Sequence, residues 1–259
     1  MSASLGSIRL PDGFHLAAYD DIDSTNDEAR RLAAGGPPPV GLAVIAARQV
    51  QGKGRPGRRW VWEPGKLYSS VVLRADTDPA ISAQLGFAVA LAVRDTLESV
   101  GGPFHKVQCK WPNDVLFNGK KIVGILLEYL AGAEAGLGAV IAGCGINVAH
   151  HPGDTDRPAT SLAAEGVEAR IEDVAAGYLA ALSAWHSTWL AEGFEPVRQA
   201  WLNAGHAPGD PLEVHIGDAN LTGAFVGLDP GGALVLDVAG EHRRFAAGDV
   251  YSADGQSGV

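Results

Sequence analysis

A short, basic, glycine-rich segment is the first candidate for chemistry. Residues 52–60 read GKGRPGRRW, and between Arg48 and Arg59 the chain has five basic residues and no acidic one. Clustering these charges costs about 1 kcal/mol or more per close pair near a surface. A bound polyphosphate would offset that repulsion, because glycines let backbone N–H groups approach an anion and guanidinium groups add paired hydrogen bonds. The alternative without a ligand is a solvated loop whose charge is incidental.

The same segment also satisfies G-x-G-x-x-G, through Gly52, Gly54 and Gly57. In a dinucleotide-binding protein that motif opens directly into a helix. Here prolines, arginines and a tryptophan follow, and then a second predicted strand, which argues against an NAD site. The chain has no G-x-x-x-x-G-K-[ST], so any ATP is expected to bind without a P-loop.

A second candidate is KWPND, at residues 110–114, which follows a predicted strand. Pro112 favours an extended Trp111, and Asn113 and Asp114 favour a turn, so Lys110 and Asp114 are expected at one strand end. A lysine beside a carboxylate suits a phosphate and its Mg²⁺. The alternative is a buried tryptophan followed by an ordinary turn.

A third candidate is Lys121, at the start of an otherwise apolar predicted strand. Asn118-Gly119 just before it is a strong hairpin signal. A lysine at the wall of the sheet, with space left by Gly124, can pair with a carboxylate and follow its charge during attack on phosphorus. The alternative is a lysine that only extends its ammonium group to solvent at the strand edge.

Ser24 and Thr25 stand at a predicted helix start, where they suit capping or hydrogen bonding to a polar ligand. The two histidines and two aspartates within residues 150–156 lack metal-ligand spacing, so no metal site is predicted there.

Further elements follow from periodicity, caps and turn residues. They are a helix between residues 23–26 and 35–37, strands at 40–48 and 66–74, a helix at 82–102, a strand at 136–148, and helices at 171–189 and 196–202. From about Pro208, short alternating runs joined by glycine-rich turns predict a small antiparallel barrel. We therefore expect an α+β (mixed α/β) domain over residues 1–206 and an appended barrel over 207–259.

Composition narrows the class of protein. With 259 residues, 46% hydrophobic, 19% charged and a net charge of -10, the chain is expected to be globular and not to coat nucleic acid or an anionic membrane. Both cysteines, Cys109 and Cys144, lie in apolar runs and are expected to be reduced core residues. We find no signal-peptide pattern and no apolar run of about 18 residues, so a cytoplasmic location is expected.

Taken together, the motifs resemble the biotin protein ligase family. They are STN at 24–26, Q-x-Q-GKGRPGRRW at 49–60, KWPND at 110–114, GKKIVGILLE at 119–128 and GCGINV at 143–148. Their combination and order are specific, whereas each motif alone is not. The resemblance implies a class II aminoacyl-tRNA synthetase-like catalytic domain with a C-terminal SH3-like β-barrel.

It also implies a two-step reaction with ATP and biotin as substrates and Mg²⁺ as the ion. The biotin carboxylate attacks the α-phosphorus of ATP to give biotinyl-5'-adenylate and pyrophosphate. A lysine of a biotin carboxyl carrier domain then attacks the mixed anhydride. Residues 50–60 are expected to be mobile without ligand and to close over the adenylate, because water would hydrolyse it.

The resemblance assigns roles by position. The biotin-binding residues would be Ser24, Thr25, Asn26, Gln49, Lys53, Gly54, Arg55, Lys121 and Gly124. The nucleotide-binding residues would be Arg55, Arg58, Trp60, Lys110, Asn113 and Asn147, with Asp114 on Mg²⁺ and with Lys121 and Arg55 catalytic. The sequence departs from the usual pattern at Lys53, where the family has an arginine, and at Pro56, which replaces a more flexible residue.

Several alternatives and further expectations remain. A lipoate ligase or octanoyl transferase shares K-x-x-G at 121–124, a non-catalytic biotin sensor would bind without labelling a carrier, and an oxidoreductase rests on G-x-G-x-x-G alone. Only 23 residues precede Ser24, too few for the DNA-binding domain of longer family members, so no DNA partner is expected. We expect a monomer or a weak homodimer that does not bind membranes.

Overall fold

The computed structural model describes most of the chain. The described residues are 5–34, 36–52, 54, 65–76, 78–103, 106–130, 138–153, 158–216 and 219–252. Four predicted site residues, Lys53, Arg55, Arg58 and Trp60, lie outside these ranges, and so does most of the segment expected to close over the adenylate.

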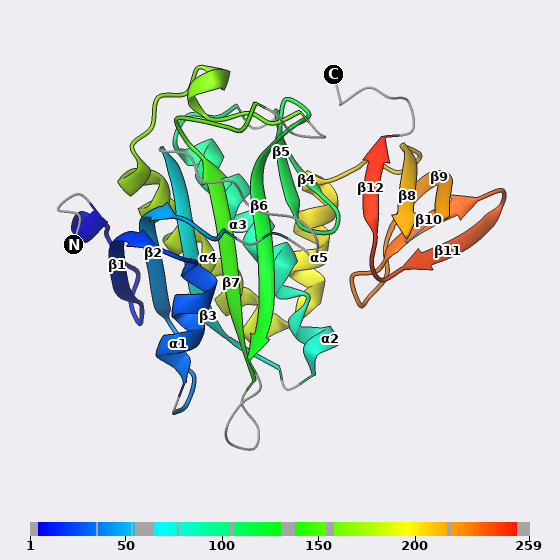
Figure 1. The fold of residues 1–259 in the computed structure, drawn as a ribbon. Helices are drawn as coiled ribbons and strands as arrows, with labels where there is room; N and C mark the ends of the chain where they lie inside the picture. The colour runs from blue at the N-terminus through cyan, green and yellow to red at the C-terminus, as the bar shows by residue number, and fades with distance from the viewer. Residues whose placement is uncertain are drawn as a thin grey trace.

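A seven-stranded mixed sheet forms the larger part of the molecule (Figure 1). Its strands in chain order are β1 (His15–Ile22), β2 (Leu42–Gln49), β3 (Lys66–Ala75), β4 (Val107–Lys110), β5 (Asp114–Phe117), β6 (Lys120–Leu130) and β7 (Gly138–Asn147). In space they run β1-β2-β3-β7-β6-β5-β4. β1 pairs with β2 in parallel, and the other pairs are antiparallel. The predicted mixed α/β fold is confirmed.

Helices cover both faces of this sheet. The short η1 (Leu5–Ser7) precedes β1, and the other helices of this part are α1 (Thr25–Ala33), α2 (Pro79–Ser82), α3 (Leu85–Ser99), η3 (Ala163–Glu165), α4 (Ile171–Glu192) and α5 (Phe194–Ala204). Ala29 of α1 packs on Val44, Val72 and Ile141 on one face. The alternate strand residues, such as Ile45 and Val71, join the core that includes α3, α4 and α5 on the other face.

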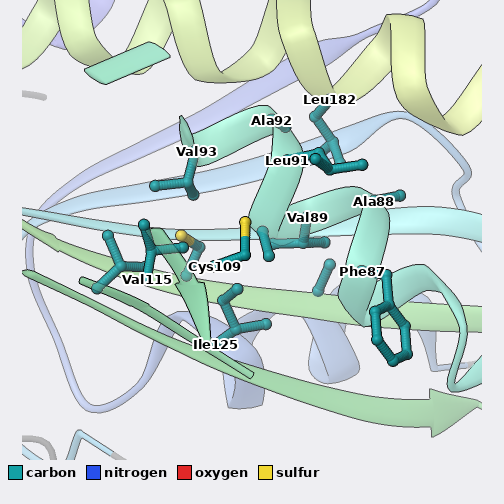
Figure 2. Close-up of a cluster of buried hydrophobic side chains, with 14 of the residues drawn as sticks. Phe87, Ala88, Val89, Leu91, Ala92, Val93, Cys109, Val115, Ile125 and Leu182 are labelled. Atoms are coloured by element: carbon teal, nitrogen blue, oxygen red, sulfur yellow. The ribbon is translucent and has the colours of Figure 1, made fainter. Parts of the chain in front are cut away.

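The main core lies between α3 and the sheet. Val89 and Val93 of α3 point toward Cys109 and other apolar strand residues, with Leu182 of α4 close by (Figure 2). Phe87 packs edge-on against Phe194 and Trp201 of α5. Residues 79–99 are apolar and long enough to cross a membrane by composition, but most of them are buried inside this core. Burial on nearly every side explains why this helix is apolar all round.

The last fifth of the chain forms a second, antiparallel sheet. Its strands are β8 (Pro211–Ile216), β9 (Ala219–Leu228), β10 (Leu234–Val238), β11 (Glu241–Phe245) and β12 (Asp249–Ser252), in the spatial order β11-β10-β9-β8-β12. This arrangement is compatible with the predicted barrel, although no pairing closes β11 on β12 among the described residues. The Trp111 indole Nε1 donates to Gly232 O at 3.1 Å and so joins the two sheets.

Most predicted elements are present, with some corrections. β1 was not predicted, and neither was the short helix α2, whereas the helix predicted over residues 82–102 is α3. The Asn118-Gly119 turn has the expected positive φ values, 49° and 72°, and the Trp111–Pro112 peptide bond is cis. Both cysteines are buried and free, as expected, and burial raises the pKa of each thiol to about 12.

Candidate active site

A row of paired residues crosses the sheet on the face that carries α1. Tyr68 on β3 pairs with Gly145 on β7, Gly145 pairs with Gly124 on β6, and Gly124 pairs with Asp114 on β5. Because alternate residues of a strand share a face, Gly145 lies on the same face as Ile141, which packs against α1. Two adjacent glycines leave the middle of this row without side chains, which suits a ligand that lies on the sheet.

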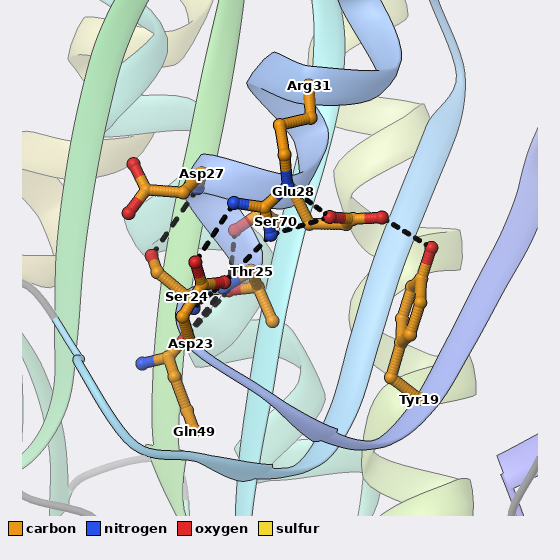
Figure 3. A network of polar contacts seen from close by, with 9 residues as sticks. All are labelled: Tyr19, Asp23, Ser24, Thr25, Asp27, Glu28, Arg31, Gln49 and Ser70. Atoms are coloured by element: carbon orange, nitrogen blue, oxygen red, sulfur yellow. Dashed lines mark hydrogen bonds and ion pairs between the residues drawn. The ribbon is translucent and has the colours of Figure 1, made fainter.

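One end of this face is the start of α1. Ser24 caps the helix from an extended conformation, and its Oγ accepts from Asp27 N at 3.4 Å. Asp23 Oδ1 accepts from Ser24 N at 2.7 Å. Hydrogen bonds from Arg31 are the main reason that the pKa of Asp23 is lowered to about 2. These contacts hold the helix start in one position (Figure 3).

Four buried polar side chains meet at that position. Thr25 donates from its backbone N and from Oγ1 to Gln49 Oε1, at 2.8 and 3.0 Å. Ser70 Oγ lies 2.7 Å from Thr25 Oγ1 and 2.5 Å from Asn26 Oδ1. Figure 3 shows Ser70 reaching Thr25 from the strand beneath the helix. The structure therefore brings together the predicted residues Ser24, Thr25, Asn26 and Gln49.

The outer end of this network is a carboxylate on β6. Asn26 Nδ2 donates to Glu128 Oε2 at 2.7 Å, and Arg30 forms an ion pair with Glu128 Oε1 at 3.1 Å. A methyl group at Gly143 would lie 2.3 Å from Asn26 Oδ1, so the glycine makes room for this side chain. Sequence reasoning missed Ser70 and Glu128.

The other end of the bare row carries a lysine and a carboxylate. Lys121 Nζ donates to Asp114 Oδ1, and Asp114 is only 4% exposed. The backbone of Lys121 is held on its other side, since its N donates to Pro158 O and its O accepts from Thr160 N, both at 2.9 Å. A buried carboxylate is tolerated when it is paired in this way. Lys121 is thus paired with a carboxylate of the chain itself, and its pairing with the reacting carboxylate remains a prediction.

In each of two predicted nucleotide-binding asparagines, only one end of the side-chain amide has a hydrogen-bond partner. Asn147 Nδ2 donates to Thr160 O at 2.9 Å, and Asn113 Nδ2 donates to Ile125 O at 2.5 Å. Both Oδ1 atoms are buried and find no partner among the described residues. An unpaired buried acceptor is costly, so a ligand that donates a hydrogen bond would be favourable at either atom.

Lys110 on β4 pairs directly with Asp114 on β5. Its Nζ is 5.6 Å from the centre of the Tyr251 ring on β12, so its ammonium group faces the second sheet. Gly54 is among the described residues, and its role near the biotin tail remains a prediction. The nucleotide-binding role of Lys110 therefore remains a prediction.

The described residues offer limited ligation for Mg²⁺. They include no group of three or more His, Cys, Asp or Glu side chains that could hold a metal. Proteins usually bind this ion through one or two carboxylates and the substrate phosphates, with several waters retained. The role of Asp114 on Mg²⁺ remains a prediction.

Comparison with known proteins agrees with this fold and site. Residues 20–147 match the family described as "Biotin/lipoate A/B protein ligase family", which defines the class of protein. Residues 212–251 match "Biotin protein ligase C terminal domain". The chain is 38% identical over 238 residues to a biotin--[acetyl-CoA-carboxylase] ligase of Paracoccus denitrificans, covering 88% of this chain and 97% of that protein. The chain belongs to the biotin protein ligase family.

More distant relatives and a solved structure agree. A bifunctional ligase/repressor BirA of Bacillus subtilis is 32% identical over 248 residues, which cover 93% of this chain and 74% of that protein. The biotin protein ligase of Aquifex aeolicus, solved in complex with biotin and ATP, is 26% identical and superimposes with a TM-score of 0.77. That match covers 92% of this chain and 99% of the other.

Proposed function

We propose that this protein is an ATP-dependent biotin protein ligase that makes biotinyl-5'-adenylate and transfers the biotinyl group to a lysine of a biotin carboxyl carrier domain. The observation that carries the proposal is the spacing of two polar groups on one sheet face. The buried polar network around Ser70 stands on β3, and Lys121 on β6 and Asp114 on β5 are two and three strand spacings away across the sheet, roughly 10 and 14 Å. Gly145 and Gly124 separate them, which suits a ligand with a polar ring at one end and a carboxylate at the other.

The first step places the biotin carboxylate near Lys121. Its ammonium group would hold the attacking oxygen and then the charge that develops on the phosphoryl oxygens. Asp114 keeps that ammonium group in position. The nucleotide would extend toward Asn147 and Asn113, whose unpaired Oδ1 atoms accept hydrogen bonds. Mg²⁺ supplies charge neutralisation on the phosphates when bound.

The second step needs a lysine from another protein. Its amine attacks the acyl carbon of the mixed anhydride, and AMP leaves. The adenylate and nucleotide would also be bound by Arg55, Arg58 and Trp60. The biotin tail would be bound by Lys53 and Gly54. The same proposal includes a catalytic domain over residues 1–206 and a C-terminal domain over 207–259. It also includes a cytoplasmic location, a monomer or weak homodimer, and no DNA or membrane partner.

A lipoate ligase is the second candidate, because the matched family also includes lipoate ligases. The buried network of Thr25, Gln49 and Ser70 favours biotin. A ureido ring has N–H and C=O groups to satisfy these polar atoms, whereas the dithiolane ring of lipoate has neither. Leaving buried polar atoms unpaired opposes the wrong substrate strongly.

Pyrophosphate exchange tests the proposal. The protein with ATP, Mg²⁺ and labelled pyrophosphate should form labelled ATP when biotin is added, and should not do so with lipoate or without an acid. Equal or greater exchange with lipoate would identify the second candidate, and binding of biotin without exchange would indicate a sensor.

A further inference from the structure

Glu128 lies at the outer end of the buried polar network that Thr25, Asn26, Gln49 and Ser70 form, and it has no role in the proposed reaction. Its Oε2 accepts from Asn26 Nδ2 at 2.7 Å, although the two residues are 102 positions apart in the chain. From the contacts that continue inward, we infer that Glu128 is a positioning residue that sets the direction of the hydrogen bonds made by Asn26 and Ser70 beside the ligand ring. This inference rests on the proposed function.

The first step is the orientation of Asn26. Its amide has one end that donates and one that accepts, and the ionised Glu128 can only accept. With Nδ2 held by Glu128, Oδ1 must face Ser70 Oγ, 2.5 Å away. A rotated amide would place its oxygen against a carboxylate oxygen, with no proton between them.

The second step concerns where the hydroxyl protons of Ser70 and Thr25 point. Asn26 Oδ1 accepts only, so the proton between it and Ser70 Oγ must come from Ser70. The bond from Thr25 N, at 2.8 Å, identifies the facing atom of the Gln49 amide as the oxygen Oε1, which can only accept hydrogen bonds. The Thr25 hydroxyl proton is therefore the one available for Gln49 Oε1, at 3.0 Å, and for Ser70 Oγ, at 2.7 Å. Both hydroxyl protons are used inside the network.

The third step concerns which donors and acceptors remain for hydrogen bonds to the ligand. Toward a bound ring, Thr25 and Ser70 can offer only lone pairs, which accept from ligand N–H groups. Gln49 Nε2 makes no hydrogen bond within the part of the chain that the structure describes, and Ser24 Oγ accepts from Asp27 N while its own proton is unused there. These two groups can donate to a ligand carbonyl. Glu128 thus fixes the acceptors that would meet the N–H groups of a ring, although it does not touch the ring.

An alternative role for Glu128 is its ion pair with Arg30. Both Glu128→Gln and Glu128→Asp test the positioning role. Glu128→Gln keeps the length, but its amide can donate as well as accept, so it no longer fixes the orientation of Asn26. Glu128→Asp keeps the charge but withdraws the acceptor. If Glu128 positions Asn26, the Kd for biotin should rise about tenfold in both variants. An ion-pair role predicts that Arg30→Gln weakens biotin binding as much as they do.

The measurement is calorimetric titration of the full chain with biotin and, separately, with ATP. Arg30→Gln is the matched control, since it removes the ion pair and leaves the acceptor for Asn26, and its Kd for biotin should stay within about twofold. The Kd for ATP should be the same in all variants. Ser70→Ala should weaken biotin binding, and Glu128→Asp should weaken it little further in that background, because both changes act on one chain of bonds.

Three results would overturn the inference: an unchanged Kd for biotin in Glu128→Gln, an unchanged Kd in Glu128→Asp, or an Arg30→Gln loss equal to that of Glu128→Asp. A wild-type chain that fails to bind biotin would instead refute the proposed function. The two failures are therefore distinguishable.

Discussion

At the scale of single residues, the account depends most on Lys121. Its ammonium group is held by Asp114 and is the described cation best placed to follow charge on the reacting carboxylate. Replacing Lys121 with Met should slow adenylate formation about 100-fold to 1000-fold, as loss of one preorganised donor does elsewhere. Single-turnover release of pyrophosphate measures this rate.

Lys120→Met is the matched control for that variant. Lys120 is the exposed neighbour in the same strand, and its Nζ lies 3.5 Å from Glu165 Oε1, away from Asp114. Its rate should stay within about threefold of the original. Equal rates in the Lys121 variant and the unmodified protein would remove Lys121 from the first step.

Sequence patterns revealed the residues of the site that lie in motifs, but not their supporting partners. Ser24, Thr25 and Gln49 stand beside a helix start or a glycine-rich segment, and the structure brings them together. Ser70 and Glu128 sit in apolar strands, and their partners are 44 and 102 positions away in the chain. A polar residue within a buried strand is a signal, but its partner follows only from the order of strands in the sheet.

At the scale of elements, α1 packs closely on β7 because β7 carries glycine where the helix side chain arrives. A methyl group at Gly143 would meet Asn26 Oδ1 at 2.3 Å and Cγ at 3.0 Å. Gly143→Ala should therefore displace Asn26, raise the Kd for biotin at least tenfold and lower stability by about 1–3 kcal/mol. Calorimetry and thermal unfolding report the two effects.

Gly86→Ala, on α3, is the control for adding the same methyl group. There the added carbon would meet Leu127 Cδ1 at 3.5 Å, which is ordinary contact, and alanine favours the helix. Biotin binding should be unchanged and stability equal or slightly higher. A Gly143→Ala protein with normal biotin affinity would show that the position of Asn26 does not matter.

Elements with strong periodicity or turn signals were predicted well, and weakly patterned ones were not. The apolar steps of α4 and the Asn118-Gly119 turn are both present. β1 was missed because HLAAYDDI has no clear alternation and lies at the sheet edge, where its residues are half-buried or exposed. Its parallel pairing with β2 also spans α1, so no local turn signal announces it.

At the scale of the whole molecule, the junction between the two sheets should make stability depend on pH. His206 lies between α5 and β8, and burial is the main reason that its pKa is lowered from 6.5 to about 4. Asp210, 3.8 Å away, opposes this shift, and the charge of Lys110 adds to it. Its ring packs edge-on against Phe225.

The sign follows from linkage between protonation and folding. The unfolded chain binds a proton at His206 below about pH 6.5, whereas the folded chain does so only near pH 4. Stability is therefore fully present above pH 6.5 and should fall by up to about 3 kcal/mol as pH drops to about 4. Urea unfolding of the wild type and of His206→Gln over this range measures the loss, which should be smaller in the variant. His242→Gln, at an exposed position of β11, should behave as the wild type does.

The sequence predicted two parts but not how they meet. The turns and short strands after Pro208 indicated a separate small β unit, and five strands are present there. The contact of Trp111 Nε1 with Gly232 O joins residues 121 positions apart, and no local pattern encodes such a pairing. Closure of that unit into a barrel remains a prediction.

The central claim is that one sheet face joins an acid to a nucleotide and passes it to a protein lysine. Mass measurement of a biotin carboxyl carrier domain, after incubation with this protein, ATP, Mg²⁺ and biotin, tests that claim most directly. The account predicts a mass increase of one biotinyl group, lost when the carrier lysine is replaced by arginine. An unmodified carrier in the presence of demonstrated adenylate would contradict the transfer step, and an unmodified carrier without adenylate would contradict the claim as a whole.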